Sequence, residues 1–264
     1  HYLGSPNKPH GLSIILEREK TYQSDAFSSS VSRNRIFITK KNTLYQIFNY
    51  LCKQIKQLSV MNDIKVMNHA ADNIRILTAA MVEKAKSGHP GGAMGGADFI
   101  NVLYSEYLQY DPENPEWEGR DRLFLDPGHM SPMLYGVLSM TGHFTLEELQ
   151  QFRQWGSPTP GHPELCVKRG VENSSGPLGQ GHTYGIGAAI AAKFLAARTG
   201  NPTFNKETIY IYISDGGIQE EVSQGAGRIA GHLGLDNVIM FYDANDIQLS
   251  TEVKEVMTED TAMK

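Results

Sequence analysis

Two stretches decide the fold: residues 208–217, TIYIYISDGG, and residues 237–247, NVIMFYDANDI. Each begins with β-branched and aromatic residues, which favour strands, and ends in a polar or glycine-containing turn. Residues 223–233, between them, have the composition of a helix. A strand, a helix and a second strand in this order predict a right-handed βαβ unit with two parallel strands.

Further helices are expected on the amino-terminal side of this unit. The predicted segments are residues 68–87, 97–108, 145–155 and 186–198. In the first, Ile74, Leu77 and Met81 recur at spacings of three and four, which places them on one helix face. The third begins with the capping-box pair Thr145 and Glu148. Together these elements predict an α/β fold, a doubly wound, mostly parallel sheet with helices on both faces.

The composition suits a single large domain and argues against several classes of protein. The chain has 264 residues, of which 40% are hydrophobic, and a net charge of −5, so it lacks the basic character of nucleic-acid-binding proteins. No apolar run approaches the roughly 20 residues of a membrane helix. Cys52 and Cys166 are too few for a disulfide framework, which favours a reducing compartment, and a cytoplasmic protein is expected.

The first 60 residues differ from the rest. They hold nine Lys or Arg against three Asp or Glu, whereas the remaining 204 residues hold 15 against 26. All ten Met lie from Met61 onward. Such a basic, serine-containing stretch is typical of an organellar transit peptide, and translated upstream sequence is the alternative. We therefore expect residues 1–60 to lie outside the fold, and residues 61–264 to form the domain.

Polar residues follow both strands of the βαβ unit. Asp215 ends the first strand and Asn245 ends the second, so the two side chains are expected on one rim of the sheet, where α/β proteins bind ligands. Carboxylate, amide and carbonyl oxygens suit a hard divalent cation such as Mg²⁺. Gly216 and Gly217 allow a phosphate to approach the backbone. A plain strand–helix turn is the simpler alternative, and the paired spacing argues against it.

This arrangement resembles the G-D-G…N signature of thiamine-diphosphate enzymes. The resemblance implies that Asp215, Asn245 and the carbonyl of Ile247 hold the metal, Mg²⁺ or else Ca²⁺ or Mn²⁺, that bridges to the cofactor diphosphate. Two departures are Ser214, where the family usually has Gly, and residues 248–250, Gln-Leu-Ser, after the metal motif.

Four further segments resemble transketolases in particular. They are K-S-G-H-P-G at residues 86–91, D-P-G-H at 126–129, T-P-G-H-P-E at 159–164 and G-P-L-G-Q-G at 176–181. The resemblance implies that His89, His129 and His162 are catalytic and contact the substrate, and that His129 also reaches the diphosphate. Glu220 matches an acid near the subunit contact. The implied cofactor-binding residues are His129, Gly176, Pro177, Leu178, Asp215, Gly216, Asn245 and Ile247. No role is expected for His143, His182 and His232, which are interpreted as ordinary surface or helix residues.

Transketolases transfer a two-carbon ketol unit from a ketose phosphate to an aldose phosphate in the pentose phosphate pathway. They need a pyrimidine-binding domain, which nothing in this chain resembles. The resemblance therefore implies a homodimer, or a partner subunit that carries this domain. The diphosphate domain is expected to continue beyond Lys264, and residues 1–264 alone are expected to be inactive.

Three other functions are compatible with parts of the sequence. A deoxyxylulose-phosphate synthase or a 2-oxo-acid dehydrogenase subunit shares the Asp215 and Asn245 pattern, but not the full set of histidine segments. A non-catalytic cofactor-binding module is the second alternative. A nicotinamide-binding Rossmann domain is the weakest, because no G-x-G-x-x-G segment follows the first strand.

Overall fold

The computed structural model describes residues 63–248 and 251–256. The chain divides into two units, and nearly all of the described residues belong to the unit that includes Asn68–Lys264. Of the other unit, Glu19–Met67, only residues 63–67 are described. The basic segment 1–60, and with it the predicted domain boundary, lies outside the described residues.

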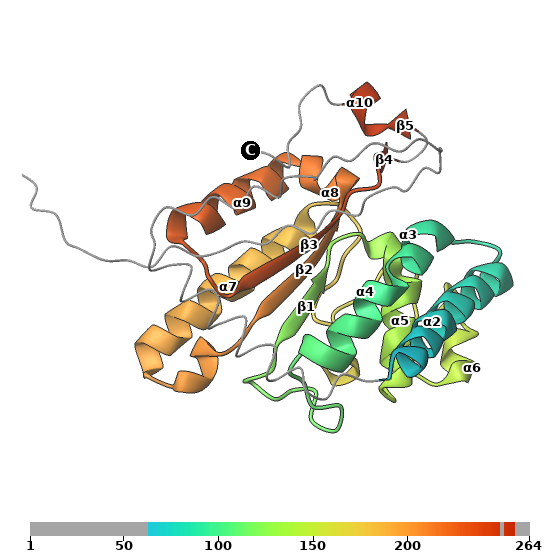
Figure 1. The fold of residues 1–264 in the computed structure, drawn as a ribbon, viewed down its shortest axis with the longest axis horizontal. Coiled ribbons are helices and arrows are strands. Elements are labelled where there is room, and N and C mark those ends of the chain that lie inside the picture. Colours follow the sequence, from blue (N-terminus) through green and yellow to red (C-terminus); the bar gives the residue numbers. More distant parts are fainter. Residues whose placement is uncertain (1–62, 249–250, 257–264) are drawn as a thin grey trace, which may run out of the picture. The chain divides into compact units, whose positions relative to one another are not determined.

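Three parallel strands form the main sheet, in the order β1-β2-β3 (Figure 1). They are β1 (Arg122–Leu125), β2 (Ile209–Ser214) and β3 (Val238–Asp243). Both predicted strands, at residues 208–213 and 237–242, are confirmed with a shift of one residue each, and helix α9 (Glu221–Leu233) connects them. The sequence pattern does not predict β1, because Arg-Leu-Phe-Leu is only four residues long and has no clear alternation.

Helices cover both faces of this sheet, which confirms the predicted fold class. On one face lie α7 (Gln180–Thr199) and α9; on the other lie α2 (Ile64–Ala85), α4 (Ala97–Val102) and α5 (Ser131–Met140). Along β2, Ile209 and Ile211 point into the core under α7, whereas Tyr210 and Tyr212 point into the core under α4 and α5. This alternation is the two-residue period of a strand buried on both faces.

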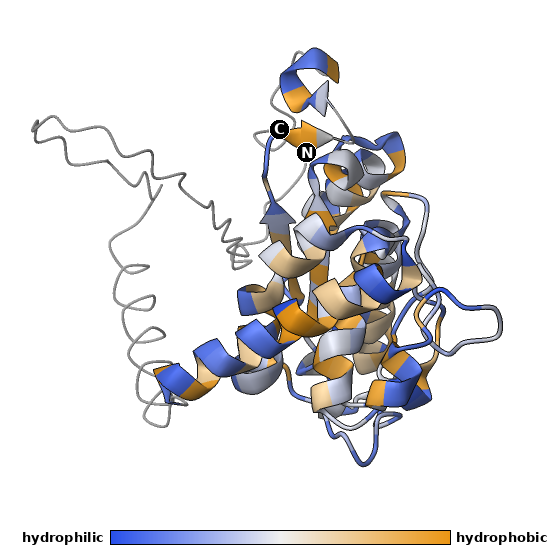
Figure 2. Ribbon diagram, turned by 90° about the vertical axis from the view of Figure 1, so that its right-hand side faces the viewer, coloured by the Kyte–Doolittle hydropathy of each residue, from blue (hydrophilic) through white to orange (hydrophobic). Residues whose placement is uncertain are grey.

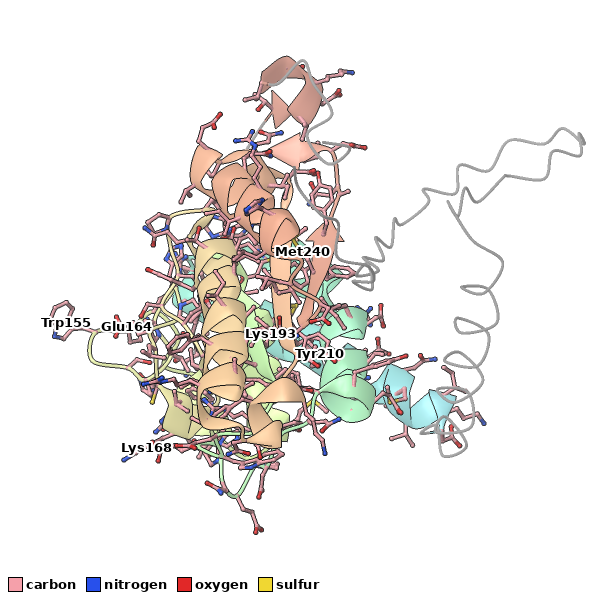
Figure 3. All side chains as sticks on the ribbon, turned by 90° about the vertical axis from the view of Figure 1, so that its left-hand side faces the viewer. Trp155, Glu164, Lys168, Lys193, Tyr210 and Met240 are labelled. Carbon is pink, nitrogen blue, oxygen red and sulfur yellow. The ribbon has the colours of Figure 1, made fainter. Side chains whose placement is uncertain are left out.

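The helices are amphipathic where they meet these cores. Figure 2 looks toward α2 and α4 and shows hydrophilic residues beside apolar ones along them, as expected for helices with one buried face. Figure 3 looks from the opposite side, with Lys193 on α7 and Met240 on β3. On this side α7 approaches the sheet closely, because a Cβ at Gly185 would lie 2.6 Å from the side chain of Ile211.

Of the four helices predicted on the amino-terminal side of the βαβ unit, three are confirmed with shifted ends. Helix α2 begins at Ile64, a few residues before the predicted start, and buries Ile74 and Met81. The helix predicted for residues 97–108 is α4, continued by a π-helical turn, η2 (Leu103–Tyr107). Residues 186–198 lie within α7, which begins six residues earlier, at Gln180.

The helix predicted for residues 145–155 is much shorter than expected. Its capping box is confirmed: Thr145 Oγ1 accepts from the N–H of Glu148, whose carboxylate accepts from the N–H of Thr145. However, α6 ends at Leu149, and turns and irregular structure follow. The helix does not continue, because the N–H of Arg153 donates to the carbonyl of Thr159 instead of to that of Leu149, and because Arg153 has a φ of 62°.

The remaining short elements surround the sheet. They are α3 (Pro90–Gly95), η3 (Gly128–Met130), α6 (Leu146–Leu149), η4 (Val167–Arg169), η5 (Pro202–Asn205), α8 (Asp215–Gln219), β4 (Ile247–Gln248), β5 (Thr251–Glu252) and α10 (Val253–Val256). None of the helices described is long and apolar enough to cross a membrane.

Candidate functional site

Asp215 and Asn245 meet at the carboxyl ends of β2 and β3. The two strands end together, since Ser214 pairs with Asp243. Asp215 is buried, and its Oδ2 atom accepts hydrogen bonds from the backbone N–H groups of Asn245 and Asp246, each at 2.8 Å. The structure thus brings Asp215 and the Asn245 turn into direct contact.

The oxygen atoms of this turn fit a hard divalent cation. Oδ1 of Asp215 accepts from the hydroxyl of Tyr242, and Oδ1 of the exposed Asn245 accepts from the N–H of Ile247 at 2.9 Å. Because a carboxylate or amide oxygen can accept twice, each of these atoms keeps a position for a cation. No three His, Cys, Asp or Glu side chains of the described residues form a metal site. A cation here would therefore need oxygen atoms of a bound small molecule, in addition to those of the protein, to complete its coordination.

The turn after Asp215 has no room for a larger residue. A Cβ at Gly217 would lie 2.3 Å from Oδ2 of Asp126, which comes from the end of β1. Gly216 is buried in the same turn. The close packing at Gly217 therefore requires glycine at that position.

The loop expected to contact the cofactor pyrimidine lies beside the turn that carries His129. A Cβ at Gly128 would lie 3.0 Å from the backbone nitrogen of Gly176 and 2.7 Å from Oγ of Ser175. Pro177 is exposed, whereas Gly176 and Leu178 are half-buried. The Ser175 hydroxyl is buried without a hydrogen-bond partner in the part of the chain that the structure describes, so a polar ligand atom could satisfy it.

The three histidines of the glycine-rich and proline-rich segments come together. The rings of His89 and His129 meet edge to face, with centroids 5.1 Å apart. The His162 ring approaches Gly128, where a Cβ would lie 3.0 Å from its Cδ2 atom. His89 precedes the short helix α3, which no sequence pattern predicts. Three loops far apart in sequence thus form one imidazole cluster.

Two members of the cluster, His129 and His162, stay uncharged at neutral pH. Burial, and then the neighbouring His89 and His162, lower the pKa of His129 to about 4. Burial, Arg153 and His89 likewise lower the pKa of His162. A neutral imidazole carries one donor and one acceptor nitrogen, so both side chains can exchange hydrogen bonds with hydroxyl groups of a ligand.

Helix α5 and Arg153 hold the His162 loop in place. Ser131 and Tyr135, on α5, donate hydrogen bonds to the carbonyls of Gly161 and Pro160 at 2.8 and 2.9 Å. Arg153 donates to the Ser87 hydroxyl at 2.7 Å, two residues before His89. Arg153 is not recognisable from the sequence, because nothing in its local pattern indicates that it joins two loops. The loop that contains Arg153 also carries the fully exposed Trp155, which points away from the protein in Figure 3.

Glu220 is exposed at the amino end of α9. It lies against the loop before α7, since a Cβ atom added to Gly179 would be 2.8 Å from the Cβ atom of Glu220. Its side chain therefore stands at the surface next to the residues expected to hold the pyrimidine.

His182 is not a surface residue, and this corrects part of its interpretation. It lies in α7 and is only 3% exposed, and its Nδ1 atom is 2.6 Å from the hydroxyl of the fully buried Ser223 on α9. His143 is half-buried and His232 is exposed. The sequence pattern does not distinguish His182 from them, because the helical face that it occupies is covered only after α9 packs against α7.

We expect the stability of the protein to decrease between pH 6.5 and pH 4. Burial lowers the pKa of His182 to about 4, so in this range the unfolded chain binds a proton that the folded protein excludes. Stability is therefore complete above pH 6.5 and is lost as the pH falls, by about 3 kcal/mol for this residue. The free energy of unfolding, measured against pH, should show a smaller decrease in His182→Gln. An unchanged slope in His182→Gln, or an equal change in the control His232→Gln, would contradict this assignment.

Comparisons with known proteins bear on the identity of this domain. Residues 66–264 match the family model described as transketolase, thiamine diphosphate binding domain. Transketolase-1, chloroplastic, of Arabidopsis thaliana is 40% identical over 238 residues, which cover 88% of this chain and 32% of the relative. The transketolase of Staphylococcus epidermidis is 43% identical over 197 residues, which cover 74% of this chain and 30% of that relative. The solved transketolase structure from Leishmania mexicana matches with a TM-score of 0.71 and 41% identity, over 75% of this chain and 30% of that one. The chain spans about a third of the length of these curated relatives, and it belongs to the transketolase family, in which it matches the thiamine diphosphate-binding domain.

Proposed function

We propose that the complete protein transfers two-carbon ketol units between sugar phosphates, and that this chain supplies the diphosphate-binding side of the active site. The observation that carries the proposal is the meeting of two sets of groups at one end of the sheet. Asp215 and the Asn245 turn lie at the ends of β2 and β3, and the imidazole cluster lies beside the turn that follows β1. This edge is where parallel α/β sheets bind ligands.

In this proposal Asp215, Asn245 and the Ile247 carbonyl hold a divalent cation, which in turn holds the cofactor diphosphate. Mg²⁺ suits these oxygen atoms, and Ca²⁺ or Mn²⁺ would use the same ligands. The bound thiamine diphosphate supplies a carbon nucleophile and an electron sink, which no side chain can provide. The protein anchors the cofactor, orients the substrate and excludes water.

The three histidines perform the proton and hydrogen-bond chemistry of the substrate. His129 and His162 are neutral at pH 7, so each donates from one nitrogen to a sugar oxygen and accepts at the other. Ser131 on α5 holds the His162 loop and Arg153 holds the His89 loop, so these donors have fixed positions. Fixed donors of this kind stabilise negative charge that develops on a substrate oxygen.

The proposed enzyme also needs groups from outside this chain. We infer that a pyrimidine-binding domain, on a second copy of the complete protein or on a partner subunit, completes the site next to Glu220 and the loop at residues 176–178. The exposed positions of Glu220 and Pro177 support a contact there. The two cysteines of the chain favour a reducing compartment, and we propose the cytoplasm.

The direct test is calorimetric titration of the full-length protein with thiamine diphosphate, with Mg²⁺ and with excess EDTA. We expect binding that requires Mg²⁺, and ketol transfer from a ketose phosphate to an aldose phosphate. Consumption of pyruvate instead of sugar phosphates would indicate another type of thiamine-diphosphate enzyme. Cofactor binding that is the same with and without Mg²⁺ would contradict the proposed site.

A further inference from the structure

The carboxylate of Asp126 lies between the two loops that the proposed function assigns to the two ends of the cofactor. Asp126 is fully buried at the end of β1. Its Oδ2 atom accepts from the N–H of Gly179 at 3.0 Å, and its Oδ1 atom accepts from the N–H of His182 at 3.1 Å. On the other side, the turn at Gly217 packs directly onto Oδ2.

This carboxylate replaces the missing cap of α7. The residue at the N-cap position is Gly179, which has a φ of 83° and no side chain with which to bond the free N–H groups of the first turn. A hydrogen-bond acceptor is favourable at this end of a helix, and the carboxylate of Asp126, which follows β1, accepts from the N–H groups of Gly179 and His182. The packing is close, since a Cβ at Gly181 would lie 2.4 Å from the Cα atom of Asp126.

A second buried hydrogen bond joins α7 to α9. His182, whose N–H bonds Asp126, also forms the buried hydrogen bond with Ser223. Ser223 lies in the first turn of α9, and α9 follows directly on the short helix that begins at Asp215. The ends of β1 and β2 and the starts of α7 and α9 are thus connected through three buried polar side chains.

We propose that Asp126, His182 and Ser223 are positioning residues, which set the spacing between the loop at residues 176–178 and the turn at residues 215–217. The proposal rests on the proposed function, in which the first loop holds the pyrimidine ring and the second holds the metal and the diphosphate. A cofactor that is bound at both ends binds tightly only when the loop at residues 176–178 and the turn at residues 215–217 are the right distance apart. The affinity for a ligand that contacts only the turn at residues 215–217 does not depend on this distance.

The experiment compares two ligands on the full-length protein in saturating Mg²⁺. Thiamine diphosphate spans both loops, whereas inorganic pyrophosphate occupies only the metal-binding turn. Asp126→Asn places an amide N–H against a backbone N–H donor, and Ser223→Ala removes the partner of His182. We expect each variant to bind thiamine diphosphate more weakly, by about tenfold or more for Asp126→Asn. Binding of pyrophosphate is expected to stay within about twofold of the wild type.

Two further variants make the outcome decisive. Ser223→Thr keeps the hydroxyl and should restore most of the affinity that Ser223→Ala loses. Asp215→Ala should weaken both ligands together, which separates failure of the metal site from failure of the spacing. The proposal is overturned if folded Ser223→Ala binds thiamine diphosphate like the wild type, or if both ligands weaken equally in it. Should Asp126→Asn fail to fold, by circular dichroism, the Ser223 pair decides alone.

Discussion

Replacing Asp215 by alanine is expected to lower the Mg²⁺-dependent affinity of the full-length protein for thiamine diphosphate by at least about a hundredfold, because even outer partners of metal ligands are worth ten- to a hundredfold. The carboxylate would be lost as a ligand. Its hydrogen bonds to the N–H groups of Asn245 and Asp246 would be lost as well, so the second proposed ligand would no longer be held in place. Calorimetric titration with Mg²⁺ measures the effect.

A matched control for this variant is Asp236→Ala. Asp236 lies before β3, at the opposite end of that strand from Asn245, and forms an ion pair with Lys193. Its replacement should leave cofactor affinity unchanged, because it removes one carboxylate at a distance from the proposed site. Equal affinities of Asp215→Ala and the wild type for the cofactor in Mg²⁺ would remove Asp215 from the metal site.

Replacing Glu172 by glutamine is expected to reduce the free energy of unfolding by about 3–5 kcal/mol. The Glu172 carboxylate accepts two hydrogen bonds from the guanidinium of Arg120, at 2.7 and 3.0 Å, and lies 3.5 Å from that of Arg122. The side chains of Arg120 and Glu172 are only 6% and 8% exposed. Removing the negative charge would leave the buried positive charge of Arg120 without compensation, and water could not replace the lost partner.

This network lies at the amino ends of β1 and β2, where Arg122 also pairs with the buried Glu207. The variant should therefore lose stability and still bind cofactor while it is folded. Denaturant titration measures the free energy, with Glu83→Gln as the control. Glu83 pairs with Lys86 at the surface, with both side chains about three-quarters exposed. Its loss should cost less than about 1 kcal/mol. A loss in Glu172→Gln no greater than in this control would show that the buried pair contributes little.

Local patterns were sufficient to predict the βαβ unit and most of the helices. The alternating residues of β2 belong to two different cores, and the apolar repeat of α2 faces the interior. These predictions succeed because side-chain periodicity depends only on the backbone geometry of the element itself. The capping box of α6 succeeded for the same reason, since both partners lie within four residues.

Predictions that depended on distant contacts were less complete. The third helix stops early because the N–H of Arg153 bonds to the carbonyl of Thr159 instead of to a helical carbonyl, and because Arg153 has a positive φ. The strand β1 is short, and it is recognisable only by its pairing with β2. His182 has the local context of any helical residue, and its burial results from the packing of α7 on α9.

The sequence by itself determined the α/β class, the parallel strand pair and the glycine-rich and histidine-containing segments that resemble transketolases. It did so because strand period, turn chemistry and motif spacing are properties of contiguous residues. Only the tertiary structure decided that His89, His129 and His162 form one cluster, and that Asp126 supports two loops at once. Those contacts join residues tens of positions apart, and they exist only because the strands and helices pack into one sheet with two cores.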